Sequence, residues 1–210
     1  MEAVAASLIV IGHSIGNVFP NPVYVLVVMA FLSFRLREGS WTAIGLGWPQ
    51  SWLRTVLMAL AAAIIQQAVG QLVVDPLIGP FLHYSAQANP LESAHNIPVF
   101  LQWLGIIWTL AAFGEEIVWR GYILNRVADI GGQSHAALVA GLLWSSVMFG
   151  CTHWYQGPAG FVTATVSGFV FGAAYLVTRK NLWVSILAHG FSDSLALVLG
   201  LLASWGRYSA

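Results

Sequence analysis

The sequence predicts an all-α protein that crosses a membrane as a polytopic helix bundle with about seven spans. We expect it to form a single membrane domain over residues 1–210. The first observation is composition, since hydrophobic residues make up 58% and charged residues 8% of the chain, with a mean hydropathy of +0.76. A soluble domain of this size carries about 25% charged residues. The second observation is that apolar residues occur in long runs, and a membrane-spanning helix needs about 20 of them.

Seven apolar segments meet this requirement along the chain. They lie at about 3–17, 21–36, 52–74, 98–127, 136–153, 159–178 and 182–203. The longest polar stretch, at 75–97, contains three prolines. It therefore predicts a loop outside the membrane, with room for a short surface helix that would make eight helices. Gly168 and Gly172 lie four residues apart in the sixth segment and indicate close helix packing there.

The positive residues predict the orientation, because Lys and Arg concentrate in cytoplasmic loops. With a cytoplasmic N-terminus, only Arg207 falls on the outer side. The residues at the cytoplasmic ends are then Arg35, Arg37, Arg54, Arg126, Arg179 and Lys180. We expect a multi-pass protein of the cell (inner) membrane, with the lipid bilayer as its partner. The net charge of zero argues against nucleic acid, and the sequence does not predict an oligomeric state.

Several ionisable residues lie inside the predicted spans, where each costs about 2.5–3.5 kcal/mol at the helix centre. With a rise of about 1.5 Å per residue, Glu115 and Asp193 lie roughly 20 Å, and His153 roughly 27 Å, from the cytoplasmic turns. These depths overlap once the helices tilt by about 20°, so the geometry allows one polar cluster in the middle of the bundle. It requires a water-filled cavity, because charge is not stable in lipid. The ionisable residues are Glu115, Glu116, Arg120, His153, His189 and Asp193.

Residues four positions apart share a helix face, and the cluster contains several such pairs. The pairs are Glu115 with Trp119, Glu116 with Arg120, Phe149 with His153, and His189 with Asp193. Opposite charges allow Glu116 and Arg120 to neutralise each other. The carboxylate of Asp193 can orient the imidazole of His189.

Three functions are compatible with this cluster. A buried polar network can fix helix register without chemistry, which predicts a non-catalytic membrane scaffold. Chains of Asp, Glu and His can relay protons, which predicts a proton- or ion-coupled transporter, but matching broken spans are not evident. A glutamate beside imidazoles can activate water as a general base. Two histidines with carboxylates can instead hold a divalent metal with an open position. Both forms of this third interpretation predict a hydrolase.

Three short motifs on successive predicted helices resemble a known family. Residues 115–120 read EEIVWR and match EExxxR, residues 149–153 read FGCTH and match FxxxH, and residues 189–193 read HGFSD and match HxxxN/D. In this order they resemble the CPBP family of type II CAAX prenyl proteases and bacteriocin-processing or abortive-infection membrane proteases. The resemblance covers about 98–203, the expected catalytic core. It implies a helical bundle with a conical cavity open towards the cytosol.

The resemblance also implies an activity and roles for residues. The activity is that of an intramembrane endopeptidase, which hydrolyses a peptide bond with a glutamate-activated water. Glu115 is similar to the water-activating glutamate, and His153 to the second essential catalytic residue. His189 and Asp193 are similar to the pair that stabilises the oxyanion or holds the water. The supporting residues are Glu116, Arg120, Phe149 and Trp119.

The resemblance leaves the metal and the substrate open. The family is described both as metal-dependent and as using a metal-free glutamate mechanism. A divalent metal such as zinc would be held by Glu115, His153, His189 and Asp193. Asp193 stands where the prenyl proteases usually have Asn, and its added charge favours a metal. Trp119 replaces a smaller or phenolic aromatic residue, which would reshape the substrate cavity. The implied partner is a peptide or protein substrate, either prenylated or otherwise anchored in the membrane.

Overall fold

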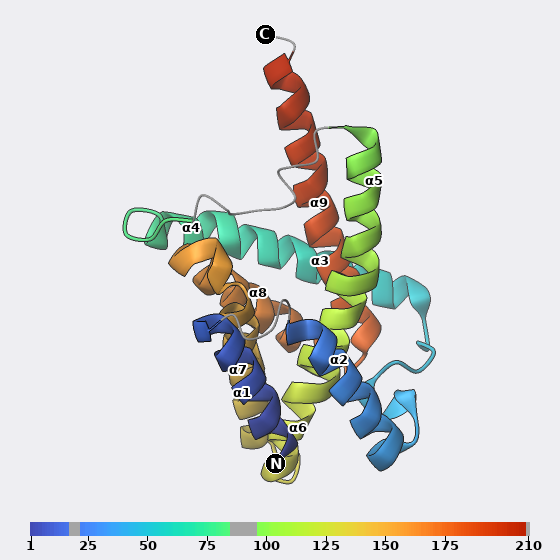
Figure 1. Cartoon of the computed structure of the whole chain (residues 1–210). Coiled ribbons are helices and arrows are strands. Elements are labelled where there is room, and N and C mark those ends of the chain that lie inside the picture. The colour runs from blue at the N-terminus through green and yellow to red at the C-terminus, as the bar shows by residue number, and fades with distance from the viewer. Residues whose placement is uncertain (17–21, 85–95, 209–210) are drawn as a thin grey trace.

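The computed structural model of the chain describes residues 1–16, 22–84 and 96–208 (Figure 1). Within these ranges the chain forms seven helical segments and no strand. The segments follow the order of the seven predicted spans, so the all-α prediction is confirmed. The start of α1 and the C-terminal end of α9 lie at opposite ends of the molecule (Figure 1).

The N-terminal part of the chain contains three of these segments. They are α1 (Glu2–Gly16), α2 (Pro22–Ser33) with its π-helical extension η1 (Phe34–Glu38), and α3 (Trp52–Val69) with its extensions η3 (Gly70–Val74) and α4 (Asp75–Ile78). A short 3-10 turn, η2 (Trp41–Ile44), joins the second segment to the third. The third helix thus continues beyond its predicted end at 74, and the first residues of the predicted loop are helical. Residues 85–95 of that loop lie outside the described residues.

The motif-bearing part of the chain contains the other four segments. One continuous helix, here called the motif helix, consists of α5 (Ile97–Ile106), η5 (Ile107–Glu115), η6 (Ile117–Leu124) and α6 (Asn125–Ile130). It is followed by α7 (His135–Thr152), a short turn η7 (Trp154–Gln156), α8 (Gly157–Val177) and α9 (Leu182–Tyr208). Hydroxyl and amide side chains begin two of these helices. Asn96 accepts a hydrogen bond from the Val99 amide, and Ser134 accepts one from the Ala137 amide, as N-cap residues do.

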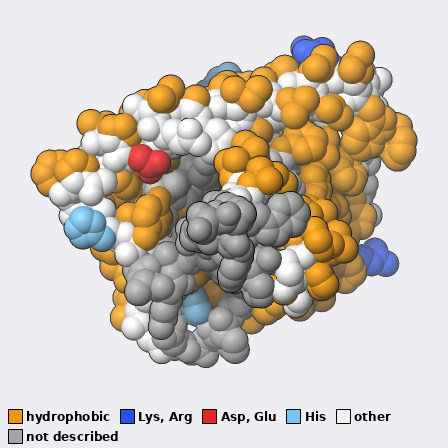
Figure 2. Space-filling model, turned by 90° about the horizontal axis from the view of Figure 1, so that it is seen from above, with side chains coloured by type: hydrophobic (Ala, Val, Ile, Leu, Met, Phe, Trp, Pro, Cys, Tyr) orange, Lys and Arg blue, Asp and Glu red, His pale blue; other side chains and the backbone are white. Residues whose placement is uncertain are grey.

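The helices have the length and surface of membrane spans. In the described part of the chain, five helices are long and apolar enough to cross a bilayer, and α1 is a shorter apolar helix. Large hydrophobic side chains are exposed on several of them, including Leu57 on α3, Leu143 on α7 and Leu199 on α9. An end-on view shows that hydrophobic side chains dominate the visible surface and that charged ones are sparse (Figure 2). Such a surface is unsuited to water, and the chain is a multi-pass membrane protein.

Helices α7 and α8 form a tightly packed hairpin beside the motif helix. A Cβ atom added to Gly168 would lie 3.1 Å from both Phe149 Cδ1 and Ser146 Cα, and one added to Gly172 would overlap the side chain of Leu142. The predicted close packing at these two glycines is therefore confirmed. It brings Phe149 and the α8 backbone against the centre of the bundle.

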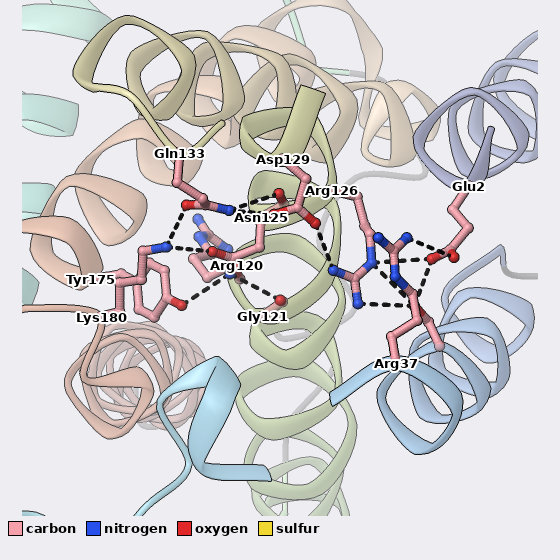
Figure 3. A network of polar contacts seen from close by, with 11 residues as sticks. Glu2, Arg37, Arg120, Gly121, Asn125, Arg126, Asp129, Gln133, Tyr175 and Lys180 are labelled. Carbon is pink, nitrogen blue, oxygen red and sulfur yellow. Dashed lines mark hydrogen bonds and ion pairs between the residues drawn. The ribbon is translucent and has the colours of Figure 1, made fainter. Parts of the chain in front are cut away.

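The end of the motif helix is held by a network around Arg126 (Figure 3). Arg126 Nε lies 3.1 Å from Glu2 Oε2 and donates to Ser33 Oγ at 3.1 Å. Its two terminal nitrogens donate to Ser33 and to Asp129 Oδ2, at 3.0 and 2.8 Å. Arg37 also pairs with Glu2, at 3.1 Å. We call these five residues the Arg126 network, and it ties α1 and α2 to the motif helix.

A second group of contacts joins the motif helix to the turn between α8 and α9 (Figure 3). Lys180 Nζ donates to Asn125 Oδ1 at 2.8 Å and to Gln133 Oε1 at 2.7 Å. Asn125 Nδ2 in turn donates to the Arg120 carbonyl at 2.8 Å and contacts the Tyr175 hydroxyl at 3.0 Å. Burial lowers the pKa of the Lys180 ammonium below its usual value. The contacts fix where α9 begins relative to the motif helix.

Candidate active site

The motif helix places an ion pair in the interior of the bundle. Glu116 and Arg120 are 0% and 1% exposed, and Arg120 NH1 lies 2.7 Å from Glu116 Oε1. The predicted pairing of these two residues is confirmed. The chain around them is wound in π-helical turns from Ile107 to Glu115 and from Ile117 to Leu124. Single π-helical turns within α-helices are frequent at functional sites, which is consistent with a functional role for this stretch.

Arg120 also connects the motif helix to the α7–α8 hairpin. Its NH2 atom donates to the Gly168 carbonyl at 2.7 Å. The guanidinium lies 5.2 Å from the ring centroid of Phe149 and 5.7 Å from that of Phe171, within the range of a cation–π contact. The close packing at Gly168 gives the guanidinium access to this carbonyl. Arg120 therefore anchors the motif helix, as its predicted supporting role requires.

His189 lies between two carboxylates. Its Nδ1 atom is 2.8 Å from Glu116 Oε1, and its Nε2 atom is 3.4 Å from Asp193 Oδ2. The ring is 5% exposed and stacks on Phe171 at a centroid distance of 5.1 Å. The predicted contact between His189 and Asp193 is confirmed. The contact with Glu116 was not predicted, and it makes one carboxylate oxygen the shared partner of Arg120 and His189.

His153 follows the last residue of α7 and is partly exposed. Its Nδ1 atom lies 2.9 Å from the Phe149 carbonyl oxygen, so this nitrogen carries a hydrogen, because a carbonyl oxygen can only accept. The Phe149 ring is 4.6 Å from the His153 ring and 5.9 Å from the His189 ring, between centroids. Phe149 thus separates the two imidazoles, and Trp119 packs against it at 5.8 Å.

Glu115 lies beside this buried network and is itself partly exposed. Its carboxylate interacts electrostatically with His189 and Asp193, and His153 interacts with the same two residues. Of the four predicted catalytic residues, the structure brings His189 and Asp193 into contact, and Phe149 contacts the rings of both His189 and His153. Glu115, His153 and Asp193 are partly exposed, whereas His189 is buried.

The predicted supporting residues are all buried. Their exposed fractions are 0% for Glu116, 1% for Arg120, 3% for Phe149 and 0% for Trp119. Trp119 is enclosed and its indole nitrogen has no hydrogen-bond partner among the described residues. It therefore shapes the site through Phe149 and not by facing open space.

A metal site was predicted from Glu115, His153, His189 and Asp193. Across residues 1–16, 22–84 and 96–208, no three His, Cys, Asp or Glu side chains gather in a way that could hold a metal ion. His189 already directs both ring nitrogens at carboxylates, and His153 directs one at a carbonyl. A histidine that binds zinc must direct the lone pair of one ring nitrogen at the metal. The side chains as arranged do not fit a metal, and metal dependence stays a prediction.

Two aromatic residues of the site carry no motif and were not predicted. Phe171 stacks on His189 and lies beneath the Arg120 guanidinium. Tyr155 stacks on His153 with ring centroids 6.1 Å apart and interacts electrostatically with Glu115. The available signals were weak, since Phe171 precedes Gly172 in the close-packed part of α8 and Tyr155 follows His153 by two residues.

A comparison with known proteins agrees with this arrangement. The family described as type II CAAX prenyl endopeptidase Rce1-like matches residues 97–195, a range that contains all three motifs. Neither the curated proteins nor the solved structures yield a match. The resemblance read from the motifs is confirmed over this range. Within this multi-pass membrane protein, residues 97–195 therefore resemble the Rce1-like family of type II CAAX prenyl endopeptidases.

Proposed function

We propose that the protein is an intramembrane endopeptidase in which Glu115 activates water. One observation carries the proposal. Glu115 is a partly exposed residue, and its neighbour in the sequence, Glu116, belongs to a buried network that contains Arg120 and His189. The network holds the site in place, while Glu115 keeps access to water and substrate. A general base must combine both conditions, because it has to be positioned and also reachable.

The reaction begins with a proton transfer. Glu115 removes a proton from water as the water oxygen forms a bond to the carbonyl carbon of the scissile peptide. The electrons of the carbonyl double bond move to its oxygen and form an oxyanion. When the oxyanion collapses, the bond between carbon and nitrogen breaks, and Glu115 returns the proton to the leaving amine. Glu115 thus acts first as a base and then as an acid.

We assign to His153 the role of orienting the attacking water. Its Nδ1 hydrogen points at the Phe149 carbonyl, which leaves the lone pair on Nε2. This lone pair accepts the second hydrogen of the attacking water and orients the water oxygen towards the substrate. The position of His153 at the end of α7, and its partial exposure, suit such a contact.

We assign to His189 the role of stabilising the oxyanion. Its contact with Glu116 is short, at 2.8 Å, whereas its contact with Asp193 is long, at 3.4 Å. The longer of the two contacts is the one that can be exchanged. The oxyanion replaces Asp193 as the acceptor of the Nε2 hydrogen as charge develops there, and catalytic contacts often tighten only at that stage. Glu116 holds the ring in place from the other side.

The steps above need no metal, and a chelator tests this. Activity should be kept after treatment of the purified protein with EDTA and 1,10-phenanthroline. Loss of activity that zinc restores would show that a metal takes part and would overturn this mechanism.

The proposed orientation and substrate follow from charge and from the location of the site. Arg37 and Arg126 lie in the network that contains the N-terminal residue Glu2. We place this end, and the mouth of the site, in the cytoplasm of the cell, following the positive-inside rule. The substrate is a peptide or protein anchored in the bilayer, because only such a chain is held at the depth of Glu115.

The decisive experiment measures cleavage in proteoliposomes. The probes are two fluorogenic peptides of the same sequence, one with an S-farnesyl group on its cysteine and one without. Glu115→Gln should lower kcat by about 10²–10⁴-fold, and His153→Asn should also lower it. His135→Asn, at an exposed histidine that begins α7, is the control and should cleave as the wild type does. If folded Glu115→Gln protein cleaves normally, the proposal is wrong.

A further inference from the structure

The interface between α3, α8 and α9 begins as an apolar layer. Ala62 of α3, Phe171 of α8 and Ala188 of α9 are buried together in one hydrophobic cluster. Their exposed fractions are 6%, 2% and 0%. A buried layer of this kind needs no solvent and holds the three helices together by packing.

One helical turn away, the same three helix faces are polar. Four residues from Ala62 the chain has Gln66, and the corresponding residues on the other helices are Ser167 and Ser192. We call these three residues the polar layer. Gln66 Nε2 donates to Ser167 Oγ at 2.9 Å. Gln67, the neighbour of Gln66, approaches the Ser192 carbonyl at 3.5 Å.

The polar layer is incompletely paired. Gln66 Oε1 and Ser192 Oγ are both buried and have no hydrogen-bond partner among the described residues. Ser192 as a whole is 5% exposed and immediately precedes Asp193 of the candidate active site. Unpaired buried polar groups are costly, and lipid tails cannot pair with them.

A bond that only braced two helices would not need these atoms. The contact between Gln66 and Ser167 uses the side-chain amide nitrogen of Gln66, and the amide oxygen of Gln66 takes no part in it. The Ser192 hydroxyl adds nothing to a contact that only holds helices together, because an alanine side chain would pack at position 192 as Ala188 packs one turn earlier. Two unpaired atoms in one polar layer therefore point to a small polar occupant that can both donate and accept. Water is such an occupant, and it needs two to four polar partners.

The polar layer also leads towards the surface. Ser167 Oγ donates to the Thr163 carbonyl at 3.0 Å, and Thr163 Oγ1 lies 2.9 Å from the Tyr84 hydroxyl. Tyr84 lines an open cavity of about 290 Å³ together with residues that include Asp75. Polar groups thus follow one another from this cavity, along α8, to Gln66 of the polar layer.

We propose that the polar layer is a buried water site, which Thr163 and Tyr84 connect to the cavity beside Asp75. Water held at Gln66 and Ser192 hydrates the side of α9 that carries Asp193. Its use in peptide hydrolysis rests on the proposed function, but the presence of the water does not. The site reaches the surface at the end of the bundle opposite to the Arg126 network.

Radiolytic labelling can test the proposal, because hydroxyl radicals form from water where it is bound and oxidise nearby thiols. Cys151 is the only cysteine of the chain, so Cys151→Ser provides a background without thiols. Ser192→Cys is compared with Ala188→Cys, one turn earlier on the same face and also buried, at 0% exposed against 5% for Ser192. In proteoliposomes, the thiol at position 192 should be oxidised at least about fivefold faster. Equal rates would show that the polar layer is dry and would overturn the proposal.

A second variant separates water binding from helix bracing. Gln66→Leu removes the unpaired oxygen and should reduce oxidation of the Ser192→Cys thiol to the rate of Ala188→Cys, without a lower thermal midpoint. A lower midpoint with unchanged oxidation would identify Gln66 as a brace only. The labelling does not depend on activity. Rapid oxidation in a protein that cleaves no peptide would therefore retain the water site and reject the proposed function.

Discussion

Two arginines on the motif helix, Arg120 and Arg126, are both buried, yet they differ in how many of their guanidinium nitrogens have hydrogen-bond partners. Arg126 is 6% exposed, and each of its three guanidinium nitrogens donates a hydrogen bond, to Glu2, Ser33 or Asp129. Arg120 is 1% exposed and donates from NH1 and NH2 only, and its Nε atom has no partner among the described residues.

The same contrast holds for the carboxylates. Both oxygens of Glu2 are engaged, by Arg37 and by Arg126. Glu116 shares one oxygen between Arg120 and His189, while its Oε2 atom is buried and without a partner in the described part of the chain. A fully paired network rigidifies a fold, whereas a partly paired one is costly and calls for a reason other than stability. The difference assigns structure to the Arg126 network and chemistry to the centre of the bundle.

The largest expected effect is that of Arg120→Met. This substitution leaves the Glu116 carboxylate buried without its cation, and breaking such a pair costs about 3–5 kcal/mol. The free energy of unfolding in detergent, measured by denaturant titration, should fall by that amount. Cleavage should be lost as well.

A double substitution separates these two losses. In Arg120→Met with Glu116→Met, both buried charges are absent, and apolar replacement of a buried pair is often close to neutral. The stability should recover for the most part. Cleavage should stay lost, because His189 no longer has the Glu116 oxygen that positions its ring. Recovery of activity together with stability would show that this pair only holds the fold.

Arg126→Met should lower stability less than Arg120→Met does, and it should leave cleavage intact. It removes charge-assisted hydrogen bonds worth about 1.5–3 kcal/mol. The carboxylates of Glu2 and Asp129 are each 34% exposed, so water can pair with them after the change. Stability should fall by about that amount, and kcat per folded molecule should stay within about twofold, since no step of the chemistry involves Arg126. A loss of kcat as large as that of Arg120→Met would remove the distinction between the two networks.

The contacts predicted correctly from the sequence are those within one helix. Glu116 with Arg120 and His189 with Asp193 are each four residues apart, and helix geometry alone brings such side chains together. The depth of each motif could also be counted from its turn. Both inferences use only the rise and the period of a helix, which do not depend on tertiary packing.

Contacts between helices could not be predicted in the same way. The contact of His189 with Glu116 joins residues 73 positions apart, and it depends on how far each helix is rotated about its axis. That rotation is set by packing, here by π-helical turns in the motif helix and by the glycines of α8. Phe171 was missed for the same reason, because an aromatic residue in an apolar helix gives no sign of which neighbour it faces.

Lys180→Met should have a modest effect on stability. The ammonium donates to two amide oxygens, those of Asn125 and Gln133, and is only partly buried. A typical net value of about 1 kcal/mol is expected, measured as a lower midpoint of thermal unfolding. Cleavage should not change. A loss of cleavage at unchanged stability would show that Asn125, which contacts the Arg120 carbonyl, transmits this contact to the site.

The smallest effect is expected at Trp119, where two terms oppose each other. Complete truncation of a buried tryptophan costs about 3–5 kcal/mol, and Trp119→Phe gives up only part of this packing against Phe149. The same change removes an indole N–H that is buried without a partner among the described residues, which relieves about 1–3 kcal/mol. The net change in unfolding free energy should stay within about 1 kcal/mol, whereas Trp119→Ala should show the full loss. Equal instability of the phenylalanine and alanine variants would show that the indole nitrogen has a hydrogen-bond partner. The polar groups at the centre of the bundle would then be more completely paired than the contrast with the Arg126 network requires.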